Sequence, residues 1–318
     1  KLMEKNKIKN LLIQNNTYLI FIGLIIVCAI VSDRFLTVMN LRNIAMQQAG
    51  PICVVLGMLF VILTGGIDLS VGSMMALGSA VSAYLIMNTG MNYILAMIIS
   101  LIIGLACGAF TGVLVAYCNF QGFVASLAMM TIARGASLVI TNGSPIRLSG
   151  DHTVTVLVKS EYGYPILIIT VLLIAFLCFV QRFTSYGRIV IAVGSNAQAV
   201  EMAGIRVKKH LVSVYALSGM LSVLGEIFIA ARAATGSGTI GEGQELDAIA
   251  SCVIGGVSLA GGKGGVFKAV IGALVLALIS NIMNLLAVPA YPQDIIKGII
   301  IIIAVFLQVF TDKSEATV

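Results

Sequence analysis

Ionisable side chains are rare in this chain, so the few that interrupt its apolar stretches are the first candidates for chemistry. Asp68 is the only acidic residue between Asp33 and Asp151, and it follows two glycines in an apolar setting. A charge at the centre of a bilayer costs about 2.5–3.5 kcal/mol on insertion scales, so an acid kept there is a functional candidate. Asp68 could instead accept hydrogen bonds from the amides that begin the next helix, and we favour this capping or hinge role.

The densest group of acids lies in the segment GEGQELDAIAS, residues 241–251. Glu242 and Glu245 precede a short apolar segment, and Asp247 lies at its start, where a helix N-terminus favours carboxylates. The cluster is therefore either a set of helix-terminal charges or the hydrogen-bonding rim of a path for a polar solute. Arg134 lies inside another apolar segment. It could pair with an acid such as Asp68, but we expect it to extend to the outer interface.

Amide side chains form a further group. Asn281 and Asn284 are three residues apart, so they share one face of a helix. Such amides more often bond between helices than contact a solute. Asn142 begins the TNGSP turn of a long polar loop. The residues that we take as candidates for a translocation path are Asp68, Asn142, Glu245, Asp247, Asn281 and Asn284.

The sequence lacks the patterns of an enzyme. GVSLAGGKGG resembles a phosphate-binding loop, but Val257 stands where that motif needs glycine and Gly264 where it needs Ser or Thr. The chain has no HExxH or GxSxG motif, and its six cysteines show no CxxC spacing. We therefore expect no catalytic residues, no metal site, no cofactor bound by this chain and no enzymatic activity.

The composition places these residues in a membrane. The chain is 59% hydrophobic and 10% charged, whereas soluble domains average about 25% charged residues. No charged residue occurs from Leu69 to Ala133, a run that holds roughly three spans of about 20 residues. The long unalternating apolar runs predict helices rather than a barrel. We predict an all-α polytopic membrane protein with one transmembrane domain, residues 1–318.

Ten apolar segments are expected to be transmembrane helices. They are Tyr18–Val31, Ala45–Leu63, Val71–Met87, Tyr93–Tyr117, Phe123–Ile140, Pro165–Val180, Leu211–Ala231, Leu246–Ile254, Ala269–Val288 and Ile295–Phe310. The eighth is too short to span alone, which is typical of a discontinuous helix. With both termini inside, twelve of the 19 basic residues lie inside and five outside, as the positive-inside rule requires. The net charge of +6 therefore indicates topology and not a nucleic-acid partner.

Glycines mark two more features. Gly104, Gly108 and Gly112 form a double GxxxG motif, which permits close helix packing. GGIDLSVG at residues 65–72 recurs as GGVSLAGG at residues 255–262. This predicts two related halves, residues 45–145 and 211–310, each with a broken helix at its glycines. Two similar turns arising by chance is the alternative. The predicted hinges are Gly65, Gly66, Gly255 and Gly256.

The polar loop between the sixth and seventh apolar segments, residues 182–210, is unusual in so apolar a chain. Ser195 and Gln198 fit an S-x-x-Q capping box, and Gly204 lies where a helix ends in a left-handed residue. They predict a two-turn helix from Asn196 to Ala203. A rigid cytoplasmic projection of this kind suits contact with another protein.

Four motifs in order resemble one family. VILTGGIDLSVGS, ITNGSPI, AVGSNAQAVEMAGI and ELDAIASCVIGGVSLAGGKG are similar to the permease subunit of bacterial sugar ABC importers of the ribose, galactose and autoinducer-2 type. The match covers most of Ala45 to Phe310. Ser195 departs from the glycine common at that position in the family.

The resemblance implies a permease in the bacterial plasma membrane that moves a pentose or hexose by alternating access. It implies two cytoplasmic ATPase subunits that carry the ATP and magnesium, an external sugar-binding protein and a second permease copy. The predicted helix then occupies the place of the family's coupling helix. Its docking face would be Ala197, Val200 and Gly204, and the coupling residues would be Gly194, Ser195, Asn196, Ala197, Val200, Glu201 and Gly204. The alternatives are an ion-coupled secondary transporter and a structural membrane protein.

Overall fold

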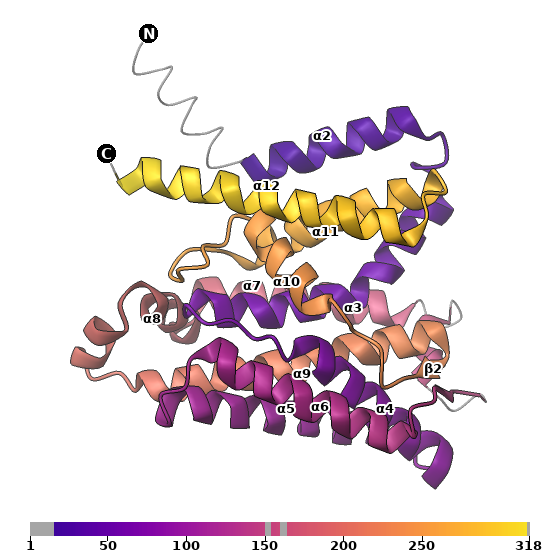
Figure 1. The fold of residues 1–318 in the computed structure, drawn as a ribbon, viewed down its shortest axis with the longest axis horizontal. Coiled ribbons are helices and arrows are strands. Elements are labelled where there is room, and N and C mark those ends of the chain that lie inside the picture. The colour runs from indigo at the N-terminus through magenta and orange to yellow at the C-terminus, as the bar shows by residue number, and fades with distance from the viewer. Residues whose placement is uncertain (1–15, 150–153, 160–163, 317–318) are drawn as a thin grey trace.

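A computed structural model describes residues 16–149, 154–159 and 164–316. Almost all of this is helical (Figure 1). The basic N-terminal segment on which the predicted orientation partly depends, residues 1–15, lies outside the described residues. The helices are α2 (Asn16–Val31), α3 (Val38–Leu63), α4 (Val71–Thr89), α5 (Tyr93–Tyr117), α6 (Gly122–Thr141), α7 (Pro165–Phe183), α8 (Ser185–Met202), α9 (Val207–Ala233), α10 (Gln244–Ile254), α11 (Val266–Leu285) and α12 (Ala290–Ala316).

Three short elements join these helices. A 3₁₀ turn, η1 (Val154–Val158), precedes α7. The two-residue strands β1 (Ile146–Arg147) and β2 (Thr235–Gly236) pair antiparallel and connect the loop after α6 to the end of α9. Several helices begin at polar caps: the Asn92 side chain accepts from the Ile94 amide at 2.9 Å, and Thr37 accepts from the Asn40 amide at 3.3 Å. These caps satisfy amides that a helix N-terminus leaves free.

Seven helices in the described part of the chain are long and apolar enough to cross a membrane: α3 to α7, α9 and α11. Each of the ten predicted apolar segments coincides with a helix. The largest shift of a single helix end is in α3, which begins at Val38 rather than Ala45 because Thr37 caps it there. α10 has only 11 residues, in agreement with its predicted shortness.

α9 lies at the centre of the bundle, packed against α3, α4 and α5 (Figure 1). The predicted close packing of the GxxxG motif is confirmed, because Gly104 and Gly108 face the α9 backbone at Gly219 and Tyr215. On the α3 side, an ideal Cβ built on Gly50 would lie 2.6 Å from the Gly225 carbonyl oxygen. The α9 backbone therefore approaches two neighbours at distances that only glycine allows.

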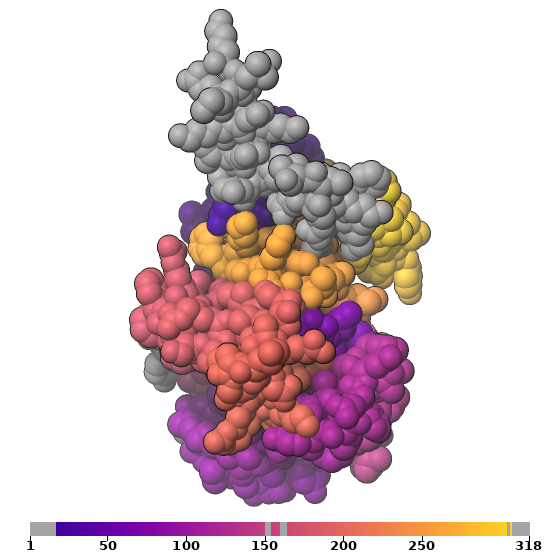
Figure 2. All heavy atoms as spheres, turned by 90° about the vertical axis from the view of Figure 1, so that its left-hand side faces the viewer, coloured from indigo at the N-terminus to yellow at the C-terminus, as the bar shows by residue number. Residues whose placement is uncertain are grey.

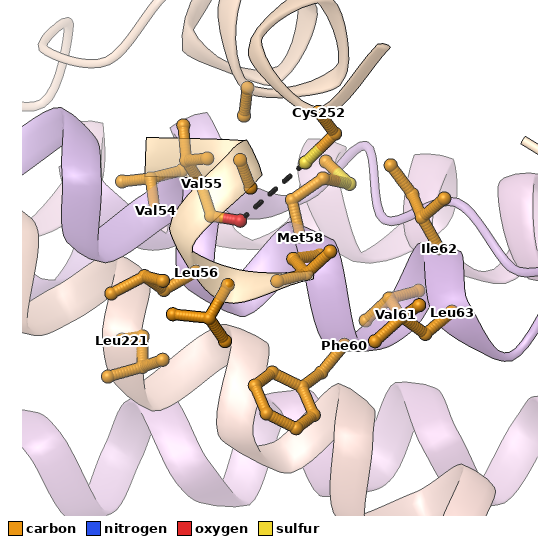
Figure 3. Close-up of a cluster of buried hydrophobic side chains, with 14 of the residues drawn as sticks. Val54, Val55, Leu56, Met58, Phe60, Val61, Ile62, Leu63, Leu221 and Cys252 are labelled. Carbon is orange, nitrogen blue, oxygen red and sulfur yellow. Dashed lines mark hydrogen bonds between the residues drawn. The ribbon is translucent and has the colours of Figure 1, made fainter. Parts of the chain in front are cut away.

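The main apolar core gathers on the second half of α3. Leu56 to Leu63 are buried there against Leu221 of α9 and Cys252 of α10 (Figure 3). The Cys252 thiol donates to the Val55 carbonyl oxygen at 3.8 Å. In contrast, only 17% of the most apolar stretch of α7 is buried inside the protein. Such an apolar but uncovered helix belongs at a lipid boundary.

We predict that Gly219→Ala lowers the free energy of unfolding by about 1–3 kcal/mol, the usual cost of overpacking. The new Cβ would collide with the Gly104 carbonyl oxygen. Thermal unfolding of the purified chain in detergent measures this. Gly135→Ala on α6 is the control, since a Cβ there meets no atom within 4 Å and alanine favours a helix by about 1 kcal/mol. Equal unfolding temperatures for the two variants would contradict the close packing.

Candidate functional site

The helices are interrupted at both glycine motifs. The first break, residues 64–70, separates α3 from α4, and the second, residues 255–265, separates α10 from α11. Near the start of each is a left-handed glycine, which is Gly65 (φ 80°) in the first and Gly256 (φ 78°) in the second. The amides of this glycine and of the next residue donate to carbonyls of the last helical turn. This is the Schellman arrangement. The sequence repeat aligns Gly65 with Gly255, whereas the left-handed glycines of these turns are Gly65 and Gly256. The two turns therefore match only when the alignment is shifted by one residue.

Asp68 fixes the first break to α9. It is 1% exposed, and its Oδ1 accepts from the Ser70 amide at 3.0 Å and the Ser70 hydroxyl at 2.6 Å. Its Oδ2 accepts from the Ser218 hydroxyl of α9 at 2.7 Å. The Ser70 amide precedes the first helical residue of α4, so these bonds form a turn before the helix and the predicted cap on amides near Gly72 is wrong. The alternative hinge role of Asp68 stays a prediction. Three hydrogen bonds offset the cost of burying the carboxylate.

The connection between α9 and α10, residues 234–243, runs back along α4 in a non-helical conformation. At one end Gly236 packs on Ala83, and the Ser237 amide donates to the Ser79 hydroxyl at 3.0 Å. At the other end Gly241 meets the backbone of Gly72. From Ala83 to Gly72 is about 16 Å of helix at the usual rise. Ten non-helical residues therefore precede the short helix α10.

Arg134 of α6 binds this connection. Its Nη1 donates to the carbonyl oxygens of Gly238 and Ile240, both at 2.8 Å, and the Ser137 hydroxyl donates to Gly238 at 3.2 Å. The pairing of Arg134 with Asp68 is therefore wrong, and its extension to the outer interface stays a prediction. A non-helical backbone among apolar helices needs such donors, because its carbonyls have no partner within the segment.

The acidic cluster surrounds the start of α10. Glu245 and Asp247 lie in its first turn. Asp247 Oδ2 lies 3.8 Å from Lys297 Nζ of α12, and the Glu245 carboxylate lies against Gly72 of α4. Glu242 is exposed in the connection. The structure therefore brings the acids to one place, where α4, α10 and α12 meet.

The asparagines lie elsewhere. Asn281 and Asn40 exchange two amide hydrogen bonds, of 2.9 and 3.1 Å, between α11 and α3. Asn284 accepts from Gln293 of α12 at 2.8 Å. Both bond between helices, the role that the sequence favoured. Asn142 ends α6 as a left-handed residue and is exposed. None of the three adjoins the acidic cluster in these contacts.

The predicted projecting helix is part of α8, which is helical from Ser185 and kinked at Asn196 (φ −162°). The Asn196 side chain, not Ser195, caps the second part by accepting from the Ala199 amide at 2.9 Å. Ser195 instead donates to the Ile191 carbonyl at 3.1 Å. The capping-box prediction is therefore wrong, because the first part of α8 continues through Ser195. Gly204 is left-handed (φ 78°), as predicted.

The exposed face of α8 also differs from the predicted docking face. Val200 is only 8% exposed and packs in a small cluster with Val193 and Val207, so it cannot belong to a docking face. Ala197, Glu201 and Gly204 are exposed. Met202, which sequence reasoning missed, is 89% exposed, an unusual position for a large apolar side chain.

On the face shown in Figure 2, the surface around α8 (salmon) lies next to that of the second break (orange). The base of α8 meets both breaks at Gly194, Gly261 and Gly262. A Cβ on Gly194 would collide with the Leu63 carbonyl oxygen and lie 2.6 Å from the Gly262 amide. That amide donates to the same Leu63 oxygen at 3.0 Å. A Cβ on Gly262 would lie 3.0 Å from Cα of Ser195. The kink of α8, the end of α3 and the second break therefore form one close contact, the glycine junction.

Tyr186 anchors α8 from the other side. Its ring stacks with Phe60 of α3 and His210 of α9, and its hydroxyl lies 2.9 Å from that of Ser213. Burial raises the pKa of Tyr186, so the hydroxyl stays neutral at physiological pH. α8 is thus held firmly at its base and exposed at its tip.

Sequence reasoning also missed Glu226. This residue of α9 is 0% exposed, and neither carboxylate oxygen has a hydrogen-bond partner among the described residues. An acid inside an apolar span was the available signal. It was overlooked because Glu226 lies inside a continuous helix, without the double glycine and the helix end that mark Asp68.

We predict that Arg134→Met destabilises the chain, since the Ile240 carbonyl loses its donor and the Gly238 carbonyl keeps only the Ser137 hydroxyl. The expected cost is about 1–3 kcal/mol, the usual value for one carbonyl left unsatisfied. Thermal unfolding in detergent measures it, and Arg134→Lys should recover part of the loss. Arg147→Met, at an exposed arginine of β1, is the control and should unfold like the parent. A fully stable Arg134→Met chain would show that the connection does not depend on Arg134.

Comparison with known proteins shows which family this chain belongs to. Residues 40–305 match the family described as "Branched-chain amino acid transport system / permease component". The chain is 39% identical over 302 residues to the ribose import permease protein RbsC of Escherichia coli K12, covering 93% of this chain and 94% of that protein. It is 40% identical to RbsC of Bacillus subtilis, covering 91% of each, and 35% identical to the D-allose permease AlsC of E. coli, covering 88% and 86%. No solved structure gave a significant match. The chain therefore belongs to this family of transport-system permeases, as the resemblance to sugar importer permeases implied.

Proposed function

We propose that this chain is the membrane-spanning subunit of an ABC importer that carries a monosaccharide, a ribose-like pentose or a hexose. The relatives are named for ribose and allose transport and are similar over nearly their whole length. The observation that carries the mechanism is the glycine junction, which links the exposed α8 directly to both helix breaks. Force applied to α8 by a partner would reach the two breaks without an intervening element.

The proposed topology has ten transmembrane segments. α2 and α12 join the seven long helices, and α10 completes a span together with the connection, residues 234–243. Both termini and α8 lie in the cytoplasm, in accord with the distribution of basic residues. Under this arrangement α8 projects from the cytoplasmic side, where ATPase subunits are available.

The proposed partners follow from what the chain lacks. Its sequence contains no intact phosphate-binding loop, so cytoplasmic ATPase subunits would hold ATP and magnesium. An external sugar-binding protein would deliver the solute. A second copy of the chain would complete the path, and the faces of α4, α10 and α12 around the acidic cluster would line it. Carboxylates suit this role because they accept hydrogen bonds from sugar hydroxyls.

One observation favours a second candidate, an ion-coupled secondary transporter. Glu226 is a buried acid without a hydrogen-bond partner among the described residues, and such acids occur in proton and ion relays. Reconstitution in liposomes separates the two. The importer requires the ATPase, the binding protein and ATP for uptake of labelled ribose or allose. Uptake by the chain alone, driven by an ion gradient, would overturn the importer.

We predict that Met202→Glu weakens ATPase association at least about tenfold, because burying an unpaired charge at an interface costs several kcal/mol. Co-purification with the ATPase measures it. Met39→Glu is the matched control: Met39 is also well exposed, at 67%, but lies in the first turn of α3, which begins on the opposite side of the molecule from α8 (Figure 1). Undiminished co-purification of the Met202→Glu chain would exclude α8 as the docking element.

We predict a different outcome for Gly194→Ala. The new Cβ would push α8 away from Leu63 and Gly262 but leave its exposed tip unchanged. The variant should therefore still bind the ATPase but lose most ATP-dependent sugar uptake. Gly135→Ala, at an open helical position, should transport normally. Normal uptake by Gly194→Ala would show that the glycine junction does not transmit motion.

A further inference from the structure

Two acids in the described part of the chain are buried, and their surroundings differ. Asp68 is 1% exposed and Glu226 is 0% exposed. Asp68 accepts three hydrogen bonds, whereas neither carboxylate oxygen of Glu226 has a hydrogen-bond partner among the described residues. A buried charge without a partner is so costly that a carboxyl in such a place becomes neutral instead.

The environment of Glu226 includes the point where the connection is attached to α4. The Ser79 hydroxyl of α4 acts on the Glu226 carboxyl, although the two do not form a hydrogen bond. The Ser79 oxygen already accepts from the Ser237 amide of the connection at 3.0 Å. Glu226 therefore lies beside the contact that holds the connection, residues 234–243, against α4.

The neighbouring buried hydroxyls give their protons to their own helices. Ser222, one turn before Glu226 on the same face of α9, donates to the Ser218 carbonyl at 2.8 Å. Ser82, one turn after Ser79 on α4, donates to the Ser79 carbonyl at 3.2 Å. The hydroxyl oxygens of Ser222 and Ser82 retain lone pairs but have no further proton to donate. A negative carboxylate gains nothing from such oxygens, whereas a protonated carboxyl has a proton of its own to donate.

The elements packed against α9 place no cation at Glu226. In the described structure α4, α5, η1 and β2 have no charged residue. α3 has only Arg42, which donates to the Tyr164 hydroxyl at 3.1 Å. Arg188 and Glu201 belong to α8, which meets α9 near His210 and Ser213, about 20 Å from Glu226 along the helix axis.

The remaining titratable groups do not compensate a charge on Glu226 either. On α9 itself Arg232 is exposed, and Lys208, Lys209 and His210 lie near its start. The other titratable side chains of α9 and of the elements packed against it are thiols and phenols, which are not cationic in either form. They are Cys53, Tyr84, Tyr93, Cys107, Tyr117, Tyr186 and Tyr215.

We propose that Glu226 is a proton-binding site, whose carboxyl is neutral while the connection is attached to α4. A proton fits better than a metal ion, because it neutralises the carboxyl without the several oxygen ligands that a metal needs. Separation of Ser237 from Ser79 would open the site to water and let the proton leave. This binding is a property of the folded chain, so it does not depend on how transport is driven.

The test compares the pH dependence of unfolding for the parent chain and Glu226→Gln, using the full chain in mixed detergent micelles. The unfolded chain releases this proton above the ordinary glutamate range, about pH 4.3, whereas the folded parent keeps it. The folding equilibrium constant of the parent should therefore fall up to about tenfold per pH unit between about pH 5 and pH 7, relative to Glu226→Gln. The glutamine variant has no proton to lose at this position.

Asp33→Asn is the control, because Asp33 is an exposed acid between α2 and α3. It should keep the pH dependence of the parent. Equal pH dependence of the parent and a folded Glu226→Gln chain would overturn the proposal.

Infrared spectroscopy provides a second measurement that does not require a stable variant. The folded parent at neutral pH should show the carbonyl stretch of a protonated carboxyl, and a folded Glu226→Gln chain should lack it. A parent spectrum without this band would overturn the proposal. Stabilisation of the parent but not of Glu226→Gln by sodium, at constant pH and ionic strength, would also overturn it, by assigning a metal ion to the carboxylate.

Discussion

The whole bundle depends on how closely the backbone of α9 approaches its neighbours. Gly225 meets Gly50 of α3, and Gly219 meets Gly104 of α5, at distances that exclude a side chain. In a bilayer, lipid competes equally well for apolar side chains, so close van der Waals packing of this kind is a main source of helix association. α3, α4 and α5 are held together largely because each packs on α9, and the breaks, the connection and α8 are all mounted on this unit.

Once the bundle is fixed, the second constraint is the backbone that leaves helical conformation inside it. Each such stretch has its own donors or acceptors. Arg134 binds the carbonyls of the connection, Ser218 of α9 binds Asp68 in the first break, and the Leu63 carbonyl of α3 binds the second break. Because these partners come from other elements, a break cannot change conformation without moving them. The non-helical segments are therefore mechanically connected, although they are far apart in the sequence.

The positions of the membrane helices could be predicted from the sequence, because the length of an apolar segment and the glycines at its ends are local properties. The sequence also predicted the left-handed residue at Gly204. It could not assign the partners of Arg134, which bonds across more than 100 residues to carbonyls that no side-chain pattern marks. It also placed Val200 outward. Three-residue spacing gives a common face, but only packing decides which face is covered, and here Val193 and Val207 cover it. The exposure of Met202 follows from the same fact.

The central position of α9 has a consequence for biosynthesis. Helices α3 to α5 leave the ribosome first, yet the surface that joins them is supplied by a helix that ends at Ala233. Residues 118–233 must be added after α5 is complete, which takes about 6–20 s at ordinary elongation rates. During that interval the glycine faces of α3 and α5 and the hydroxyls of α4 contact lipid or the insertion machinery. The first half of this protein is thus an incomplete structure that persists in the membrane until α9 is inserted.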